Sequence, residues 1–108
     1  MKRRVVLKAH VKPGAHSVIG HGNVKFLHVA MQHGTPTVWF EADEYTPLST
    51  KDNADHQQGI GDTIGVLSVL TGEAFNKPEN YVFLGSAVSD HFVVHVYVEK
   101  KYVGDHHY

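Results

Sequence analysis

The chain has 108 residues, a formal net charge of −1 with histidine neutral, ten histidines and no cysteine. This length is sufficient for one domain with its own hydrophobic core, so we expect residues 1–108 to form a single soluble domain. The absence of cysteine excludes disulfides, thiolate metal sites and cysteine nucleophiles. A net charge near zero argues against nucleic acid as a partner, and no apolar run approaches the roughly 18 residues that cross a bilayer.

Alternating apolar and polar residues predict antiparallel strands along most of the chain. We expect these strands at residues 4–11, 17–19, 24–32, 37–43, 81–88 and 91–99. The run 62–72, DTIGVLSVLTG, fits a further core strand or a short helix, because brief apolar runs are ambiguous. Five to seven strands without an amphipathic helix predict an all-β or β-rich α+β fold, built as a small antiparallel sandwich or barrel.

The connections between these strands include two predicted hairpins. In HGTP, Gly34 supplies the positive φ that a tight hairpin requires, and Ser89–Asp90 joins the last two strands. Residues 44–61 have many turn formers and no apolar period, so we expect a long polar loop, of a kind that is often functional or mobile. Residues 104–108, GDHHY, are expected to be a flexible tail.

The two strands around the first hairpin carry the only tryptophan. Strict alternation places Leu27 on the same face as Val29 in the strand 24–32. In the strand 37–43, Trp39 and Glu41 lie opposite Phe40. Trp39 is therefore either a core residue or an exposed anchor for an interface or a stacked ligand.

The last strand raises the question of a histidine site. In SDHFVVHVYVE, alternation places His91, His95, Tyr97 and Glu99 on one face. The two histidines are four residues apart, which is about 13 Å at roughly 3.3 Å per residue, too far for one metal ion. A shared metal would need a bulge or a histidine from another strand, so we predict no metal site. We expect this face to point to water, to a partner or to a second sheet.

No catalytic signature is present in the chain. G-x-S-x-G, H-E-x-x-H and G-x-G-x-x-G are absent, and GIGDTIG lacks the Lys–Ser/Thr ending of a phosphate loop. Glu73 is a turn residue or could meet an arriving histidine. We predict no enzyme activity, no catalytic residue and no cofactor. The candidate residues for ligand or partner binding are Trp39, Glu41, Thr71, Gly72, Glu73, His91, His95 and Tyr97.

The order of several short motifs resembles a family of small tailed-phage proteins of unknown function. The motifs are the hairpin Gln32–Gly34, Trp39, Thr71–Gly72, the strand Tyr81–Gly85 and the strand His95–Glu99. The resemblance covers about residues 4–100. The chain departs from the family pattern at Glu73, where the family has histidine, and in residues 44–61, which are longer than usual. The resemblance implies a phage origin and a β-rich fold, and it implies no activity.

Together these observations predict a small non-enzymatic binding protein in the cytoplasm of an infected bacterium. Its partner would be a host protein or a nucleotide-type defence signal that the protein sequesters during host takeover or counter-defence. A homo-oligomer is expected, because small sequestering proteins often form pockets between protomers. Two alternatives remain open, a structural or accessory protein of the virion and a histidine-centred metal-dependent enzyme.

Overall fold

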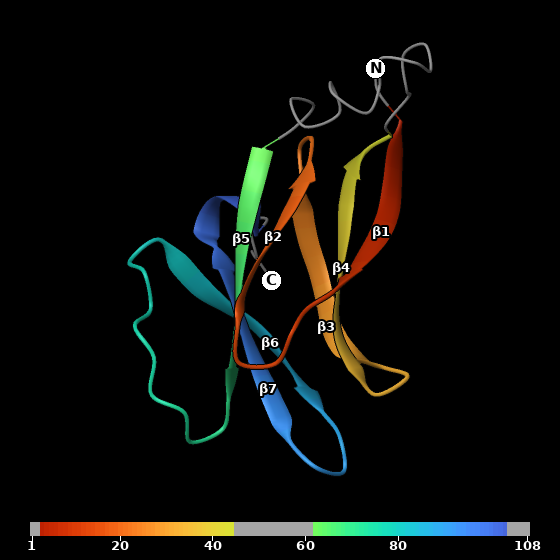
Figure 1. Ribbon diagram of the computed structural model, residues 1–108. Coiled ribbons are helices and arrows are strands. Elements are labelled where there is room, and N and C mark those ends of the chain that lie inside the picture. Colours follow the sequence, from red (N-terminus) through yellow and green to blue (C-terminus); the bar gives the residue numbers. More distant parts are fainter. Residues whose placement is uncertain (1–2, 45–61, 104–108) are drawn as a thin grey trace, which may run out of the picture.

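The computed structural model describes residues 3–44 and 62–103, which form strands and one short 3-10 helix (Figure 1). The elements are β1 (Arg4–His10), β2 (His16–His21), β3 (Lys25–Gln32), β4 (Thr35–Asp43), β5 (Asp62–Leu70), β6 (Tyr81–Val88), β7 (Val93–Glu99) and the helix η3 (Lys100–Tyr102). The predicted loop 44–61, apart from Glu44, and the predicted tail 104–108 lie outside the described residues.

The strands form two antiparallel sheets that face each other. Sheet A has the order β1-β4-β3, and sheet B has the order β2-β5-β7-β6. Figure 1 shows the two sheets nearly edge-on, with sheet A on the right. The all-β prediction is confirmed, and the sandwich is the correct alternative because the strands form separate sheets. The run 62–72 contains the strand β5, not a helix.

The core lies between the two sheets and is built from the residues that alternation assigns to the inner faces. At its centre are Val38, Phe40 and Ala42 of β4, Ile64 and Val66 of β5, and Val94, Val96 and Val98 of β7. All of these side chains are buried, which removes their apolar surface from water and provides the main driving force for association of the sheets.

The hairpin between β3 and β4 is confirmed. Its two turn residues, His33 and Gly34, have φ values of 51° and 80°, the left-handed conformations that two-residue hairpins require. The second hairpin, between β6 and β7, is also present but has a longer turn. Ser89 Oγ accepts the N–H groups of His91 and Phe92, at 3.2 and 3.1 Å. The prediction that His91 lies in the strand is therefore wrong, because this turn delays the start of β7 until Val93.

The predicted orientation of Leu27 is also wrong. Phe26 pairs with Phe40 and His28 pairs with Trp39, so a β-bulge adds one residue to β3 at this point. An extra residue interrupts the alternation of inner and outer faces. Leu27 is consequently 42% exposed, whereas Phe26 is buried in the core.

Candidate functional site

Trp39 and Glu41 lie on the outer face of sheet A, so the core alternative for Trp39 is wrong. Trp39 is half-buried between its cross-strand partners Lys8 and His28, and the rings of Trp39 and His28 are 5.7 Å apart. Lys8 Nζ donates a hydrogen bond to Gln32 Oε1 at 2.6 Å. Because Lys8 and Gln32 lie in the two strands that flank β4, this bond spans β4 on the face that carries Trp39.

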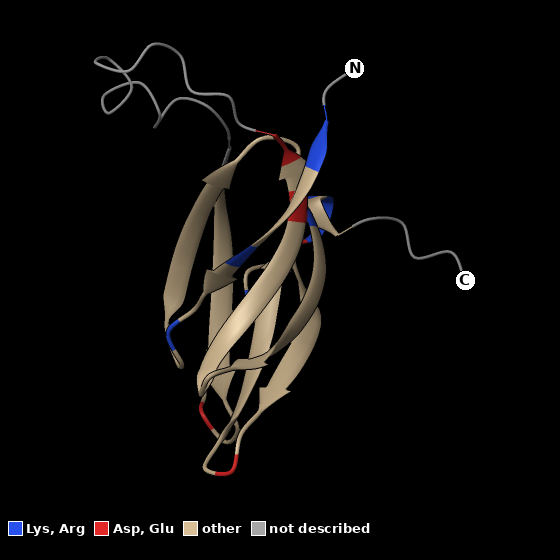
Figure 2. Ribbon diagram, turned by 90° about the vertical axis from the view of Figure 1, so that its right-hand side faces the viewer, with Lys and Arg blue, Asp and Glu red and all other residues tan. Residues whose placement is uncertain are grey.

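Glu41 belongs to a surface ion-pair network. Arg4 donates to Glu41 at 3.2 Å and to Asp43 at 3.0 Å. In Figure 2, Lys, Arg, Asp and Glu lie mostly toward the ends of the strands. Exposed ion pairs of this kind contribute little to stability, and they leave Glu41 engaged within the sheet.

Gly72 and Glu73 form the turn that follows β5. Gly72 has a φ of 88°, and Glu73 accepts the Leu70 N–H through its Oε1 at 3.1 Å. The Glu73 N–H in turn donates to the Leu70 carbonyl at 3.0 Å. The carboxylate therefore closes this turn, and the histidine that approaches it contacts the neighbouring Thr71 instead.

His95 is held on the outer face of sheet B by two hydroxyl groups. Its Nε2 lies 2.7 Å from Thr71 Oγ1, and its Nδ1 lies 2.8 Å from Ser86 Oγ. A neutral imidazole donates from one nitrogen and accepts at the other, so one hydroxyl donates to the ring and the other accepts from it. In hydrolase triads a carboxylate orients the histidine, but both nitrogens of His95 are occupied by hydroxyls. The two hydroxyl groups therefore fix the orientation of the ring.

Three aromatic rings lie next to this histidine, and we call Phe75, Tyr97 and Phe83 the aromatic row. The Tyr97 ring centroid is 5.3 Å from that of Phe75 and 5.6 Å from that of Phe83. Phe75 and Phe83 are 41% and 54% exposed. These spacings are typical of tilted and edge-to-face ring pairs. The aromatic row is therefore a connected apolar surface that remains open to solvent.

The strand order of sheet B produces this arrangement. Since β7 lies between β5 and β6, the connection of residues 71–80 must cross β7 to join its two neighbours. Figure 1 shows this connection along the outer side of sheet B, at the left. The crossing brings Phe75 onto Tyr97 of β7, and Phe83 faces Tyr97 directly from β6.

A second polar cluster lies on the other side of the aromatic row. Tyr81 Oη is 2.9 Å from His16 Nε2, so the tyrosine reaches across sheet B to the strand at its opposite edge. It passes over Gly65, whose missing side chain leaves the necessary space. Glu99 Oε2 accepts the Gly65 N–H at 3.2 Å, and Glu99 Oε1 accepts from Asn80 at 3.4 Å. The aromatic row thus lies between two hydrogen-bonded histidine clusters.

Burial raises the pKa of Tyr81 above its ordinary value, and the nearby Glu99 carboxylate raises it further. A raised pKa in the folded state stabilises the protein fully below the ordinary tyrosine pKa of about 10, and this contribution is lost as the pH rises through the folded-state value. We expect the difference in unfolding free energy between the wild type and Tyr81→Phe to shift against the wild type above about pH 10. Urea unfolding at several values from pH 8 to pH 11 measures this difference; a constant difference would contradict it.

Several residues of this face were not identified by sequence reasoning. Ser86 could have been found by counting the register of the last hairpin, which places it opposite His95 once the turn length is known. Phe83 could not be found in this way, because the register of β6 shifts between Phe83 and Gly85 and simple counting would place Leu84 opposite Tyr97. No sequence signal identified Phe75 or His16, because the residues that they contact are determined by the strand order of sheet B.

Neither a metal centre nor a membrane-spanning helix is found in the described parts of the chain. Across residues 3–44 and 62–103, no three His, Asp or Glu side chains are grouped to hold an ion. The same residues contain no helix with the length and apolar character needed to cross a bilayer.

The fold and this face define a β-sandwich that presents an aromatic surface on one sheet. A family described as a domain of unknown function, DUF7352, matches residues 2–105, and the chain belongs to this family. The expected membership in a family of unknown function is thereby confirmed, and the phage origin stays a prediction. No curated protein and no solved structure matches the chain.

Proposed function

We propose that this protein is a non-enzymatic binding module that contacts a partner protein through the aromatic row. The observation that carries the proposal is the exposure of Phe75 and Phe83 on either side of Tyr97. Aromatic residues are enriched at protein interfaces, where they bury a large area at little cost in side-chain entropy. A connected pair of half-exposed phenylalanines is costly in water, and a partner would remove that cost.

The surroundings of the aromatic row support a protein partner over a small molecule. Small ligands favour concave sites that enclose most of their surface, whereas the aromatic row lies on the outer face of a sheet. The hydrogen-bonded clusters of His95 and His16 border the row on its two sides. An apolar centre with a polar border is the common anatomy of protein interfaces.

The order of motifs supports a more specific setting. We propose that the protein is phage-encoded and that its partner is a host protein in the cytoplasm of the infected cell. A nucleotide-type signal fits less well, because Lys77, the cation nearest to Phe75 in the chain, already donates to the Tyr81 carbonyl at 3.0 Å. Self-association through the same face is the competing outcome, and the experiment below separates it from the host partner.

Photo-crosslinking in the infected host tests the placement of the contact surface. A photoreactive phenylalanine analogue at position 75 is expected to capture one specific host protein. The control position is Val6, an apolar residue that is 61% exposed on the outer face of sheet A. Equal capture from positions 75 and 6 would contradict the placement, and a cross-link between two copies of the chain would replace the host partner by a homo-oligomer.

Substituting the exposed ring then tests its energetic importance. Phe75→Ser is expected to weaken binding of the captured protein at least about tenfold, because interface aromatics are frequent hot spots. Isothermal titration calorimetry measures the affinity, and Val6→Ser is the matched control that should leave it unchanged. Unchanged affinity of Phe75→Ser, with its circular dichroism spectrum intact, would contradict the proposal.

A further inference from the structure

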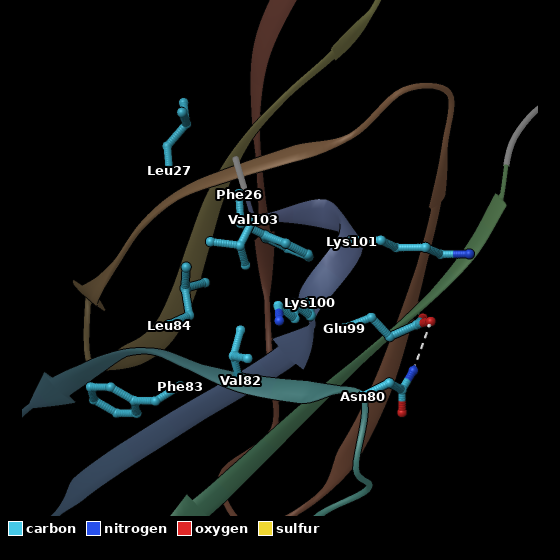
Figure 3. Close-up of a pocket in the computed structure, with 10 residues that line it drawn as sticks. All are labelled: Phe26, Leu27, Asn80, Val82, Phe83, Leu84, Glu99, Lys100, Lys101 and Val103. Carbon is cyan, nitrogen blue, oxygen red and sulfur yellow. Dashed lines mark hydrogen bonds between the residues drawn. The ribbon is translucent and has the colours of Figure 1, made fainter. Parts of the chain in front are cut away.

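A separate groove lies where the edge strands of the two sheets meet, away from the Thr71–His95–Ser86 cluster. It is open to solvent, with a volume of about 1020 Å³, and is formed by β3, β6 and the helix η3 (Figure 3). Its apolar lining consists of Phe26, Leu27, Val82, Phe83, Leu84 and Val103. Such a volume is in the range of small-molecule sites, which are concave and mostly apolar.

Two β-bulges create the groove. The register of β3 shifts between Phe26 and His28, and that of β6 shifts between Phe83 and Gly85. The extra residues are Leu27 and Leu84, and both line the groove. Bulges often re-aim side chains beside functional sites. Next to the second bulge, a Cβ on Gly85 would be 3.3 Å from Val29 Cβ, so β3 and β6 approach each other closely beside the groove.

The helix η3 supplies the polar part of the groove. Tyr102 is buried and anchors the helix in the core, and the Lys100 backbone N–H donates to the Asn80 carbonyl at 2.7 Å. Figure 3 shows the Lys100 side chain beside Val82, whereas Lys101 extends away from the apolar residues. The Lys101 ammonium lies 5.1 Å from the centroid of the Tyr102 ring.

Lys100 and Lys101 both line the groove, but the Lys101 ammonium lies over the Tyr102 ring, and Lys100 is the cation beside the apolar residues. Within residues 3–44 and 62–103, its ammonium makes no ion pair and no hydrogen bond. The neighbouring Glu99 carboxylate already accepts from Gly65 and Asn80. A groove that presents the Lys100 ammonium to its apolar part and also includes the Glu99 carboxylate favours a monoanion, since a dianionic phosphate would meet more repulsion from Glu99.

We propose that the groove binds a monoanionic amphiphile, an acyl chain with a carboxylate head. The chain lies along Leu27, Val82 and Leu84, and the carboxylate pairs with the Lys100 ammonium. The apolar lining accounts for the acyl chain, and the Lys100 ammonium accounts for the head group. The groove and the aromatic row share Phe83, but Phe75 and Lys100 each belong to only one of them, so substitutions at these two residues test the two proposals separately.

Titration of the full chain with dodecanoate, at concentrations below micelle formation, tests the proposal by isothermal calorimetry. We expect one dodecanoate per chain and an affinity about tenfold lower for Lys100→Gln, as a charge-assisted contact is lost. Lys101→Gln is the matched control and should bind as the wild type does. Dodecyltrimethylammonium, which has the same tail and a cationic head, should bind more weakly than dodecanoate to the wild type.

The location is tested separately by NMR and by substitution. Methyl resonances of Leu27, Val82 and Leu84 should shift on addition of dodecanoate, and Leu27→Glu should abolish binding by placing an anion at the groove. Phe75→Ser should leave dodecanoate binding unchanged, which separates this site from the aromatic row. Absence of binding, equal loss in Lys100→Gln and Lys101→Gln, or equal affinity for the two amphiphiles would overturn the proposal.

Discussion

Replacing Phe40 by alanine is expected to lower the free energy of unfolding by about 3–5 kcal/mol. Phe40 is 1% exposed at the centre of β4, and its ring centroid lies 6.1 Å from that of Phe26 and 5.3 Å from that of His21. Removal of the ring leaves a cavity between the sheets and deletes both ring contacts. Urea denaturation followed by tryptophan fluorescence measures the change, since Trp39 is the neighbouring residue in the chain.

The matched control removes a phenylalanine ring from an exposed position. Phe83→Ala deletes a phenylalanine that also lies in a strand but is 54% exposed. Its expected cost is below about 1.5 kcal/mol, the contribution of one exposed aromatic pair. Similar losses for Phe40→Ala and Phe83→Ala would show that burial does not distinguish the two positions, against the sandwich described above.

Gly65→Ala is expected to cost about 1–3 kcal/mol, because it overpacks the outer face of sheet B. A Cβ at this position would overlap Tyr81 Oη and lie 2.8 Å from His16 Nε2. The new methyl group must displace the tyrosine and break its hydrogen bond to His16. At a glycine with room for a Cβ, alanine would instead stabilise the protein by about 0.4–1 kcal/mol, because it lowers the conformational entropy of the unfolded chain. The sign of the change in unfolding free energy therefore shows whether Tyr81 occupies the space above Gly65.

Two further variants isolate this cause. In a Tyr81→Phe background the overlapping oxygen is absent, so Gly65→Ala should cost less there than in the wild type. Gly22→Ala is the control for the substitution itself, because its Cβ would meet only Asp43 Oδ2, at 3.8 Å. Thermal unfolding of the wild type, Gly65→Ala, Tyr81→Phe, the double variant and Gly22→Ala gives the comparison. An equal cost of Gly65→Ala in both backgrounds would show that Tyr81 does not occupy this space.

Local signals in the sequence were sufficient for the strands and for the first hairpin. Alternation with a period of two identified the inner residues of β4 and β7, since each strand has one face that is almost entirely apolar. Gly34 marked the first turn because few other residues adopt its conformation at little cost. The same alternation placed His95 and Tyr97 together on one face, where the structure also has them.

Features that depend on contacts between distant strands were not predictable. Leu27 was assigned to the wrong face because both sides of β3 carry apolar residues, so nothing in the pattern revealed the bulge. Trp39 could be read as core for a similar reason. Phe75 lies in a turn-rich connection, and only the order β5-β7-β6 brings it onto Tyr97. The sequence therefore predicted that His95 and Tyr97 share a face, but it did not identify Phe75 beside them.

The pairing of β2 has a consequence for the way the chain acquires its structure. Among the described strands, β2 is hydrogen-bonded to β5 alone, although both strands of the β3–β4 hairpin and residues 44–61 separate β2 from β5 in the sequence. Hairpins form within about 1–10 μs, whereas folds dominated by distant pairings need about milliseconds to seconds. During synthesis, the backbone of β2 stays without its strand partner until β5 has emerged from the ribosome. Slow steps in refolding, and any association of nascent chains, should therefore trace to β2.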